Sequence, residues 1–276
     1  EDIKFLVQEA KQQVSKNYYN QNIVHIIINN YKINSVDYDY LQTDINCKII
    51  SLDILFICLP QEMIEYFKSI FYKFNVSIKQ TICASYAKAI NYKDNFSLNK
   101  DVSFIDVGFN KTSITSFVNN KIISLSALPI GGNHITKDIS KILKIDLKYA
   151  EKLKLNLDKN KTFLDDKNYS LELLQKIIFA RTEEILEMSA LSIESNLMTK
   201  SQYKMILTGD GSRILDNHHK DKISFPNDID FLDETIEDIC QSGFKLVMGS
   251  NKQEVVVIPK KQIKQGFFEK LFHFFQ

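Results

Sequence analysis

Hydrophobic positions along this chain switch repeatedly between the period of a strand and the period of a helix. Leu6, Ala10 and Val14 recur at helical spacing and fit the end of a helix. Strands are predicted at 23–28, 49–59, 76–82, 102–107, 112–118, 122–128 and 204–208, and helices at 60–71, 84–90, 135–143, 147–153, 170–188 and 233–248. Strands that alternate with helices in this way predict an α/β fold.

Short polar segments separate these elements. Turns at 108–111 and 119–120 make the three strands between residues 102 and 128 a meander. The polar segment 154–169 is predicted to be a loop. Residues 252–262 are predicted to be a tether, with an edge strand at 255–258 as the alternative.

Composition limits the classes of function. The 276 residues are 44% hydrophobic and 25% charged, which is enough for real cores, and the net charge of +1 provides no overall attraction for nucleic acid. The chain has no apolar run of about 18 residues and no signal-peptide pattern, so we expect neither a membrane span nor secretion. It starts without methionine, from which we expect a fragment. The four cysteines lack metal-ligand spacing.

The last 14 residues are basic and rich in phenylalanine. As a helix, residues 263–276 would be about 20 Å long, too short to cross a hydrocarbon core of about 30 Å. Its apolar side chains fall on one half of the helix, so we predict a helix that lies in the membrane interface. The predicted membrane contacts are Ile263, Phe267, Phe268, Lys270, Leu271, Phe272, Phe274 and Phe275. The alternative is a terminal helix docked on the protein's own core.

Two glycine turns are candidates for binding phosphate or a nucleoside. In residues 104–114 a strand ends in Asp106, turns at Gly108 and returns from Thr112, so that an aspartate could hold a metal-bound water and amides could face an anion. In residues 206–214 a strand again runs into glycines at the start of a helix. A plain β-hairpin and a plain strand-to-helix turn are the alternatives. The candidate nucleotide-binding residues are Asp106, Gly108, Asn110, Lys111, Thr112, Gly209, Asp210, Gly211 and Ser212.

Further motifs lie between the two glycine turns. They are Leu128–Pro129–Ile130–Gly131–Gly132, then Ile135–Thr136–Lys137–Asp138–Ile139, then Ala150–Glu151–Lys152–Leu153–Lys154, and the amphipathic segment comes last. This order resembles the FtsA family of actin-like cell-division proteins, which has a counterpart of each motif in the same order. By family length, about a hundred residues that include the first phosphate loop are expected before Glu1.

The resemblance implies an actin-like (ribonuclease H-like) fold with two lobes and a nucleotide cleft. It divides the chain into a remnant of the FtsA-specific subdomain (1–80), a nucleotide-binding core (81–145 and 203–250), a helical subdomain (146–202), and a tether with a membrane-targeting helix (251–276). It implies ATP with Mg²⁺ as cofactor and places the protein peripherally on the cytoplasmic face of the bacterial inner membrane, at the septum. The implied partners are FtsZ, whose acidic tail would dock near Arg181, further divisome proteins, anionic lipids and other copies of the chain in filaments.

Departures from the family pattern bear on catalysis. Phe109 and Asn110 stand at glycine positions, Lys111 at a threonine position, and Asp210 replaces the middle glycine of the second turn. These changes predict ATP binding with weak or absent hydrolysis, and no catalytic residue is assigned. The alternatives are a pilus-assembly scaffold of the same fold, which does not need the aromatic tail, and a small-molecule kinase, for which no catalytic aspartate can be named.

Overall fold

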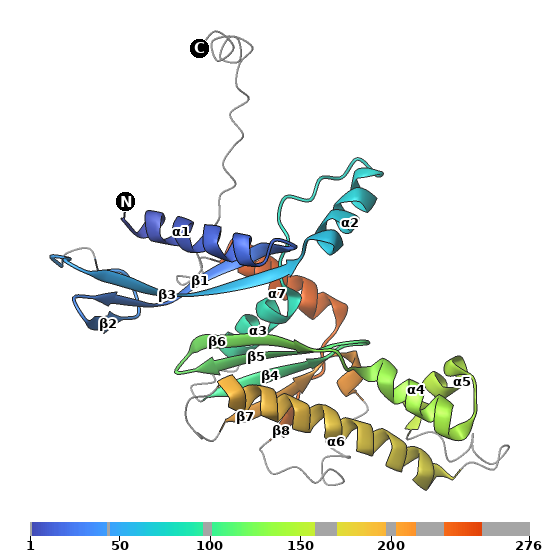
Figure 1. Cartoon of the computed structure of the whole chain (residues 1–276). Helices are drawn as coiled ribbons and strands as arrows, with labels where there is room; N and C mark the ends of the chain where they lie inside the picture. Colours follow the sequence, from blue (N-terminus) through green and yellow to red (C-terminus); the bar gives the residue numbers. More distant parts are fainter. Residues whose placement is uncertain are drawn as a thin grey trace.

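The computed structural model describes residues 2–42, 45–95, 101–157, 170–196, 203–213 and 229–249 (Figure 1). Two β-sheets organise this part of the chain, with helices between and around them. The helices are α1 (Asp2–Asn17), α2 (Gln61–Tyr72), α3 (Ala84–Asn95), α4 (Gly132–Leu143), α5 (Leu147–Leu155), α6 (Leu171–Asn196) and α7 (Ile236–Met248). The strands are β1 (Gln21–Ile33), β2 (Val36–Tyr38), β3 (Ile50–Pro60), β4 (Val102–Val107), β5 (Thr112–Val118), β6 (Lys121–Leu128), β7 (Lys204–Thr208) and β8 (Ile229–Phe231).

The first sheet is a three-stranded antiparallel sheet with strand order β2-β1-β3. Helix α1 packs against it through Val7, which lies in one cluster with Ile26 and Ile28 of β1. The other face contributes Ile27 and Ile57 to the core that this sheet shares with the rest of the molecule. The two faces follow from the strand period of two.

The second sheet has five strands in the order β6-β5-β4-β7-β8. Strands β4, β5 and β6 form the antiparallel meander, whereas β7 and β8 run parallel to β4. A parallel neighbour requires a long connection, and the chain between β6 and β7 supplies it with α4, α5 and α6.

Alternation along β4 assigns each face of this sheet to different helices. Val102 and Phe104 point into the cluster that contains α3, whereas Ile105 and Val107 point into the cluster that contains α6. Helices α3 and α7 therefore lie between the two sheets, and α6 covers the opposite face (Figure 1). A third cluster joins α4, α5 and the first half of α6.

Most of the predicted elements are confirmed, and the differences have local causes. The strand predicted at 76–82 is wrong: this segment is irregular and mostly exposed, and it pairs with no strand in the described part of the chain. Strands β2 and β8 were not predicted, because each has only three residues and exists through pairing with a longer neighbour.

The predicted tether and membrane helix, 251–276, lie outside the described residues, as does most of the predicted loop 154–169. Among the helices that are described, none combines the length and the apolar character needed to span a bilayer.

Candidate functional site

Three turns of the chain meet at one edge of the five-stranded sheet because of the strand directions. The parallel strands β4 and β7 pair from Val102 with Lys204 onward, so both end at the same edge, where Gly108 and Gly209 follow. Leu128 at the end of β6 pairs with Thr112 at the start of β5, so the connection to α4 leaves from this edge too. We call 108–111, 129–132 and 209–212 the three turns.

Glycines allow the three turns to touch one another through their backbones. A Cβ atom on Gly131 would lie 2.5 Å from the carbonyl oxygen of Gly108, and one on Gly211 would lie 2.7 Å from that of Val107. The amide of Gly132 donates to the Gly108 carbonyl over 3.0 Å, and the amide of Asn133 donates to the Phe109 carbonyl over 2.8 Å. The glycines are therefore required for the packing of the turns themselves.

Gly209 has a further role at the end of β7. Its φ of +90° belongs to the region that favours glycine. A Cβ atom there would lie 2.5 Å from Oδ1 of Asp106. This carboxylate is thus held directly against the second glycine turn.

Two hydroxyl groups expected near a ligand instead bond within the turns. Thr112 is fully buried and donates to the Ile130 carbonyl oxygen over 2.7 Å. Ser212 is buried as well and donates to the Gly209 carbonyl oxygen, also over 2.7 Å. Both side chains therefore stabilise the geometry of the turns, and nucleotide binding by Thr112 and Ser212 stays a prediction.

The other candidate residues lie on the outside of the turns. The Asn110 side chain accepts a hydrogen bond from Asn133 over 2.9 Å, and Lys111 and Asp210 are exposed. Asp210 is 3.3 Å from the guanidinium group of Arg213. The side chains free to meet a solvent-borne ligand here are therefore of both charge signs.

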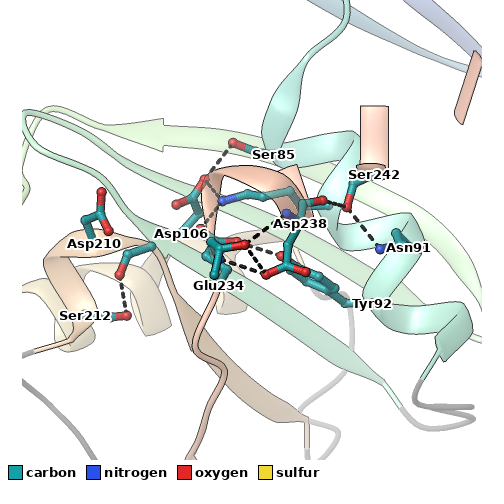
Figure 2. A network of polar contacts seen from close by, with 12 residues as sticks. Ser85, Asn91, Tyr92, Asp106, Asp210, Ser212, Glu234, Asp238 and Ser242 are labelled. Carbon is teal, nitrogen blue, oxygen red and sulfur yellow. Dashed lines mark hydrogen bonds and ion pairs between the residues drawn. The ribbon is translucent and has the colours of Figure 1, made fainter. Parts of the chain in front are cut away.

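A buried network of ionic contacts lies beside the turns and was not predicted. Lys88 on α3 is 4% exposed, and its Nζ lies 2.8 Å from Oδ2 of Asp106 and 2.6 Å from Oε1 of Glu234. Asp106 follows Phe104 on the same face of β4, which is the face that α3 covers. The alternation of the strand thus turns Asp106 toward the lysine (Figure 2).

Hydroxyl groups complete this network. The Tyr92 hydroxyl donates to Oε2 of Glu234 over 2.8 Å, and the Ser85 hydroxyl donates to Oδ2 of Asp106 over 3.2 Å (Figure 2). Burial, and then the hydrogen bond to Glu234, raise the pKa of Tyr92 far above its ordinary value. The tyrosine is therefore a neutral donor that satisfies the second oxygen of the glutamate.

Glu234 is positioned by the start of α7. Thr235 caps this helix, with Asp238 as the reciprocal partner of a capping box, so the residue before the cap has a fixed backbone. Arg213 also donates to the Glu234 carbonyl oxygen over 2.7 Å. The network consequently ties α3, β4 and α7 to the second glycine turn.

A second buried lysine supports the first turn of α4. Nζ of Lys154 donates to the Gly132 carbonyl oxygen over 3.1 Å and to Oγ1 of Thr136 over 2.8 Å, and it lies 2.7 Å from Oε2 of Glu151. Thr136 also donates to this glutamate. Thr136, Glu151 and Lys154 fall in the motifs at 135–139 and 150–154, which support the resemblance but were not predicted to be site residues.

Asp106 and Glu234 do not fit a divalent cation while Lys88 lies between them. Sequence reasoning expected Asp106 to hold a metal-bound water, but its Oδ2 is already in contact with an ammonium group and a hydroxyl, and its Oδ1 packs against Gly209. Glu234, the next carboxylate, is occupied by Lys88 and Tyr92. In the part of the chain that the structure describes, no three His, Cys, Asp or Glu side chains are grouped to hold a metal.

Arg181 lies on α6, away from the three turns. Its Nε lies 2.6 Å from Oδ2 of Asp138 on α4, and its Nη1 lies 2.6 Å from Oε2 of Glu184. The hydrogen bond with Asp138 is the main reason why the pKa of the guanidinium group is raised. Arg181 is 27% exposed, so a docking peptide would compete with these two carboxylates.

Comparison with known proteins identifies the relatives of this chain. The family model described as "Cell division protein FtsA" matches residues 103–209. FtsA of Bacillus subtilis is 30% identical over 128 residues, which are 40% of this chain and 29% of that protein. FtsA of Buchnera aphidicola is 25% identical over 308 aligned positions, which cover 99% of this chain and 72% of that protein. The matches thus span from under a third to nearly three quarters of their relatives' length, and the resemblance inferred from the motifs is confirmed.

Solved structures extend the likeness to the fold. The PilM-PilN type IV pilus biogenesis complex gives a TM-score of 0.61 at 13% identity over 83% of this chain and 62% of that chain. MreB5 of Spiroplasma citri, bound to ADP, gives a TM-score of 0.51 at 14% identity over 69% of this chain and 68% of that chain. At such identities the likeness establishes the fold alone, and it confirms that the fold is actin-like.

Proposed function

Because this chain is similar to FtsA cell division proteins, we propose that it acts in cell division as an actin-like protein that links FtsZ to the membrane. It would bind ATP at the three turns, assemble into filaments on the cytoplasmic face of the inner membrane, and recruit further divisome proteins at the septum. The observation that carries the proposal is that three turns converge at one edge of an actin-like sheet, and that the FtsA family model matches the first two of them and reaches Gly209, the first residue of the third.

The nucleotide part of the proposal is supported by the position of the turns. Ends of parallel strands followed by glycine turns are a common location for phosphate and nucleoside binding. The exposed Lys111 offers a positive charge at the first turn, whereas the exposed Phe109 adds bulk there. The engagement of Asp106 by Lys88 supports the expectation of weak or absent hydrolysis.

The membrane part rests on the sequence of residues 263–276. Burial of apolar groups contributes about 0.8 kcal/mol per CH₂ and each nearby lysine contributes about 1 kcal/mol on anionic lipid, opposed by the ordering of the helix. One such segment would bind only marginally. A filament would present many copies to one surface and raise the overall affinity without new contacts.

Flotation of lipid vesicles tests the proposal. The full chain, fluorescent FtsZ, ATP and vesicles that contain anionic lipid are mixed and centrifuged through a density gradient. We expect FtsZ to float only when this protein is present, and to stay at the bottom with the Phe268→Glu, Phe272→Glu double variant. The matched control replaces the same residues by leucine, which keeps the apolar face. Flotation of FtsZ with the glutamate variant would show that the membrane link lies elsewhere.

A further inference from the structure

Lys88 lies between two carboxylates, which are groups that also bind divalent metal ions. Its Nζ is 2.6 Å from Glu234 and 2.8 Å from Asp106, and the three side chains are 4%, 5% and 20% exposed, respectively. The oxygens come from elements far apart in the chain, β4 and the residue before the cap of α7. One ammonium group is thus the bridge between them.

The distances are close to those of a cation site. Calcium binds oxygen ligands at about 2.3–2.6 Å and magnesium at about 2.0–2.1 Å. Without the ammonium group, the two carboxylates would need only a small inward movement to bind calcium, and water would supply the rest of its roughly six to eight oxygen ligands. Lys88 is itself almost completely buried, so its ammonium group is largely withdrawn from water.

Charge makes the lysine necessary in this position. Two carboxylates so little exposed repel each other, and their repulsion is not screened as it would be in water. The hydroxyl groups of Tyr92 and Ser85 donate hydrogen bonds but carry no charge. Lys88 therefore supplies the positive charge that these two carboxylates require.

We propose that Lys88 is a built-in cation that replaces a divalent metal ion between Asp106 and Glu234. The intact protein accordingly needs no metal at this carboxylate pair, and removal of the ammonium group turns the pair into a divalent-cation site. For nucleotide binding, which rests on the proposed function, the consequence is an affinity for ATP that depends little on Mg²⁺.

Thermal unfolding of the full chain tests the built-in cation directly. The parent, Lys88→Ala and Lys88→Ala with Glu234→Gln are melted in EDTA and in calcium or manganese chloride up to about 10 mM, with KCl added to equal ionic strength. We expect the Tm of the parent to change by less than about 1 °C. Lys88→Ala should melt lower in EDTA and regain several degrees with metal, because metal binds the folded state.

The double variant is the matched control, because it removes one metal ligand together with the excess negative charge. It should melt above Lys88→Ala in EDTA and need at least tenfold more metal for the same shift. Lys88→Arg retains the positive charge and should stay as insensitive to metal as the parent. If Lys88→Ala is unfolded in EDTA, far-ultraviolet circular dichroism should show folding as metal is added.

Two results would overturn the proposal. One is an increase of several degrees in the Tm of the parent protein when metal is added. The other is a Lys88→Ala variant, folded or unfolded in EDTA, that metal stabilises no more than it stabilises the parent. Calorimetry with ATP in EDTA and in Mg²⁺ tests the functional consequence, and we expect parent affinities within about threefold of each other. A tenfold requirement for Mg²⁺ would refute this consequence. A parent without ATP binding would refute the proposed nucleotide site, while the metal titration still decides the role of Lys88.

Discussion

Replacement of Gly131 by alanine is the sharpest test of how the three turns pack. The φ of Gly131 is −168°, an extended backbone that alanine adopts without strain, so the substitution adds a methyl group and nothing else. That methyl group would lie 2.5 Å from the Gly108 carbonyl oxygen and 2.9 Å from two more backbone atoms, Lys111 N and Phe109 O. All three neighbours are main chain, so no side chain can rotate away.

The magnitude follows from the contacts that must open. Ordinary contact begins at 3.4 Å, so the first turn must retreat by 3.4 minus 2.5, or 0.9 Å. This movement would break or lengthen the hydrogen bonds from Gly132 to Gly108 and from Asn133 to Phe109. Each such bond contributes about 0.5–1.5 kcal/mol, and overpacking costs about 1–3 kcal/mol. We expect a loss of about 2–4 kcal/mol of unfolding free energy, or roughly 5–15 °C in Tm.

Urea denaturation followed by circular dichroism measures this loss. The matched control is Gly243→Ala, because Gly243 lies inside α7 with no atom within 4 Å of the added Cβ. This control should gain up to about 1 kcal/mol from helix propensity. A Gly131→Ala variant within about 0.5 kcal/mol of the parent would show that the turns do not touch as described.

Three further predictions concern other parts of the molecule. Burial raises the pKa of the Cys83 thiol, so iodoacetamide at pH 8 should modify Cys83 at least tenfold more slowly than the exposed Cys240. Peptide mass spectrometry measures both rates, and equal rates would contradict this prediction. The folded protein holds the Tyr92 proton more tightly than the unfolded chain, so the stability that this proton contributes is complete below about pH 10 and falls as the pH rises further. In urea melts, Tyr92→Phe should therefore lose less unfolding free energy above pH 10 than the parent. An equal loss in both proteins would refute the assignment. In anisotropy titrations at low salt, Arg181→Ala should weaken binding of an FtsZ tail peptide about tenfold. Asp138→Asn removes a carboxylate that competes for the guanidinium group and should strengthen the binding. Unchanged affinity in the alanine variant would show that Arg181 is not part of the docking surface.

The order of elements could be predicted because each one depends on residues close together in the chain. The period-two pattern of β4, β5 and β6 and the helical spacing in α4 are visible in windows of a few residues. The strand predicted at 76–82 failed for the opposite reason. Its residues suit a strand, but a strand also needs a partner, and partners are fixed by the fold.

The candidate site could be predicted only in its backbone. Glycines at the ends of β4 and β7 predicted two of the three turns, because a turn depends on the residues within it. The hydrogen bond of the Thr112 hydroxyl could not be predicted from the sequence, because its acceptor, the Ile130 carbonyl oxygen, belongs to a different turn. A lysine among the apolar residues of α3 was the one visible sign of the buried network.

The sequence by itself determined most of the strands and helices, the glycine turns and the resemblance to FtsA proteins, all of which are properties of short segments and their order. Only the tertiary structure decided which charges meet. Lys88 and Glu234 are 146 positions apart, and they are brought into contact because α3 and α7 pack together on the face of β4 to which alternation directs Asp106. An ion pair has no local signature, because its energy depends on distance and burial, and both exist only once the chain has folded.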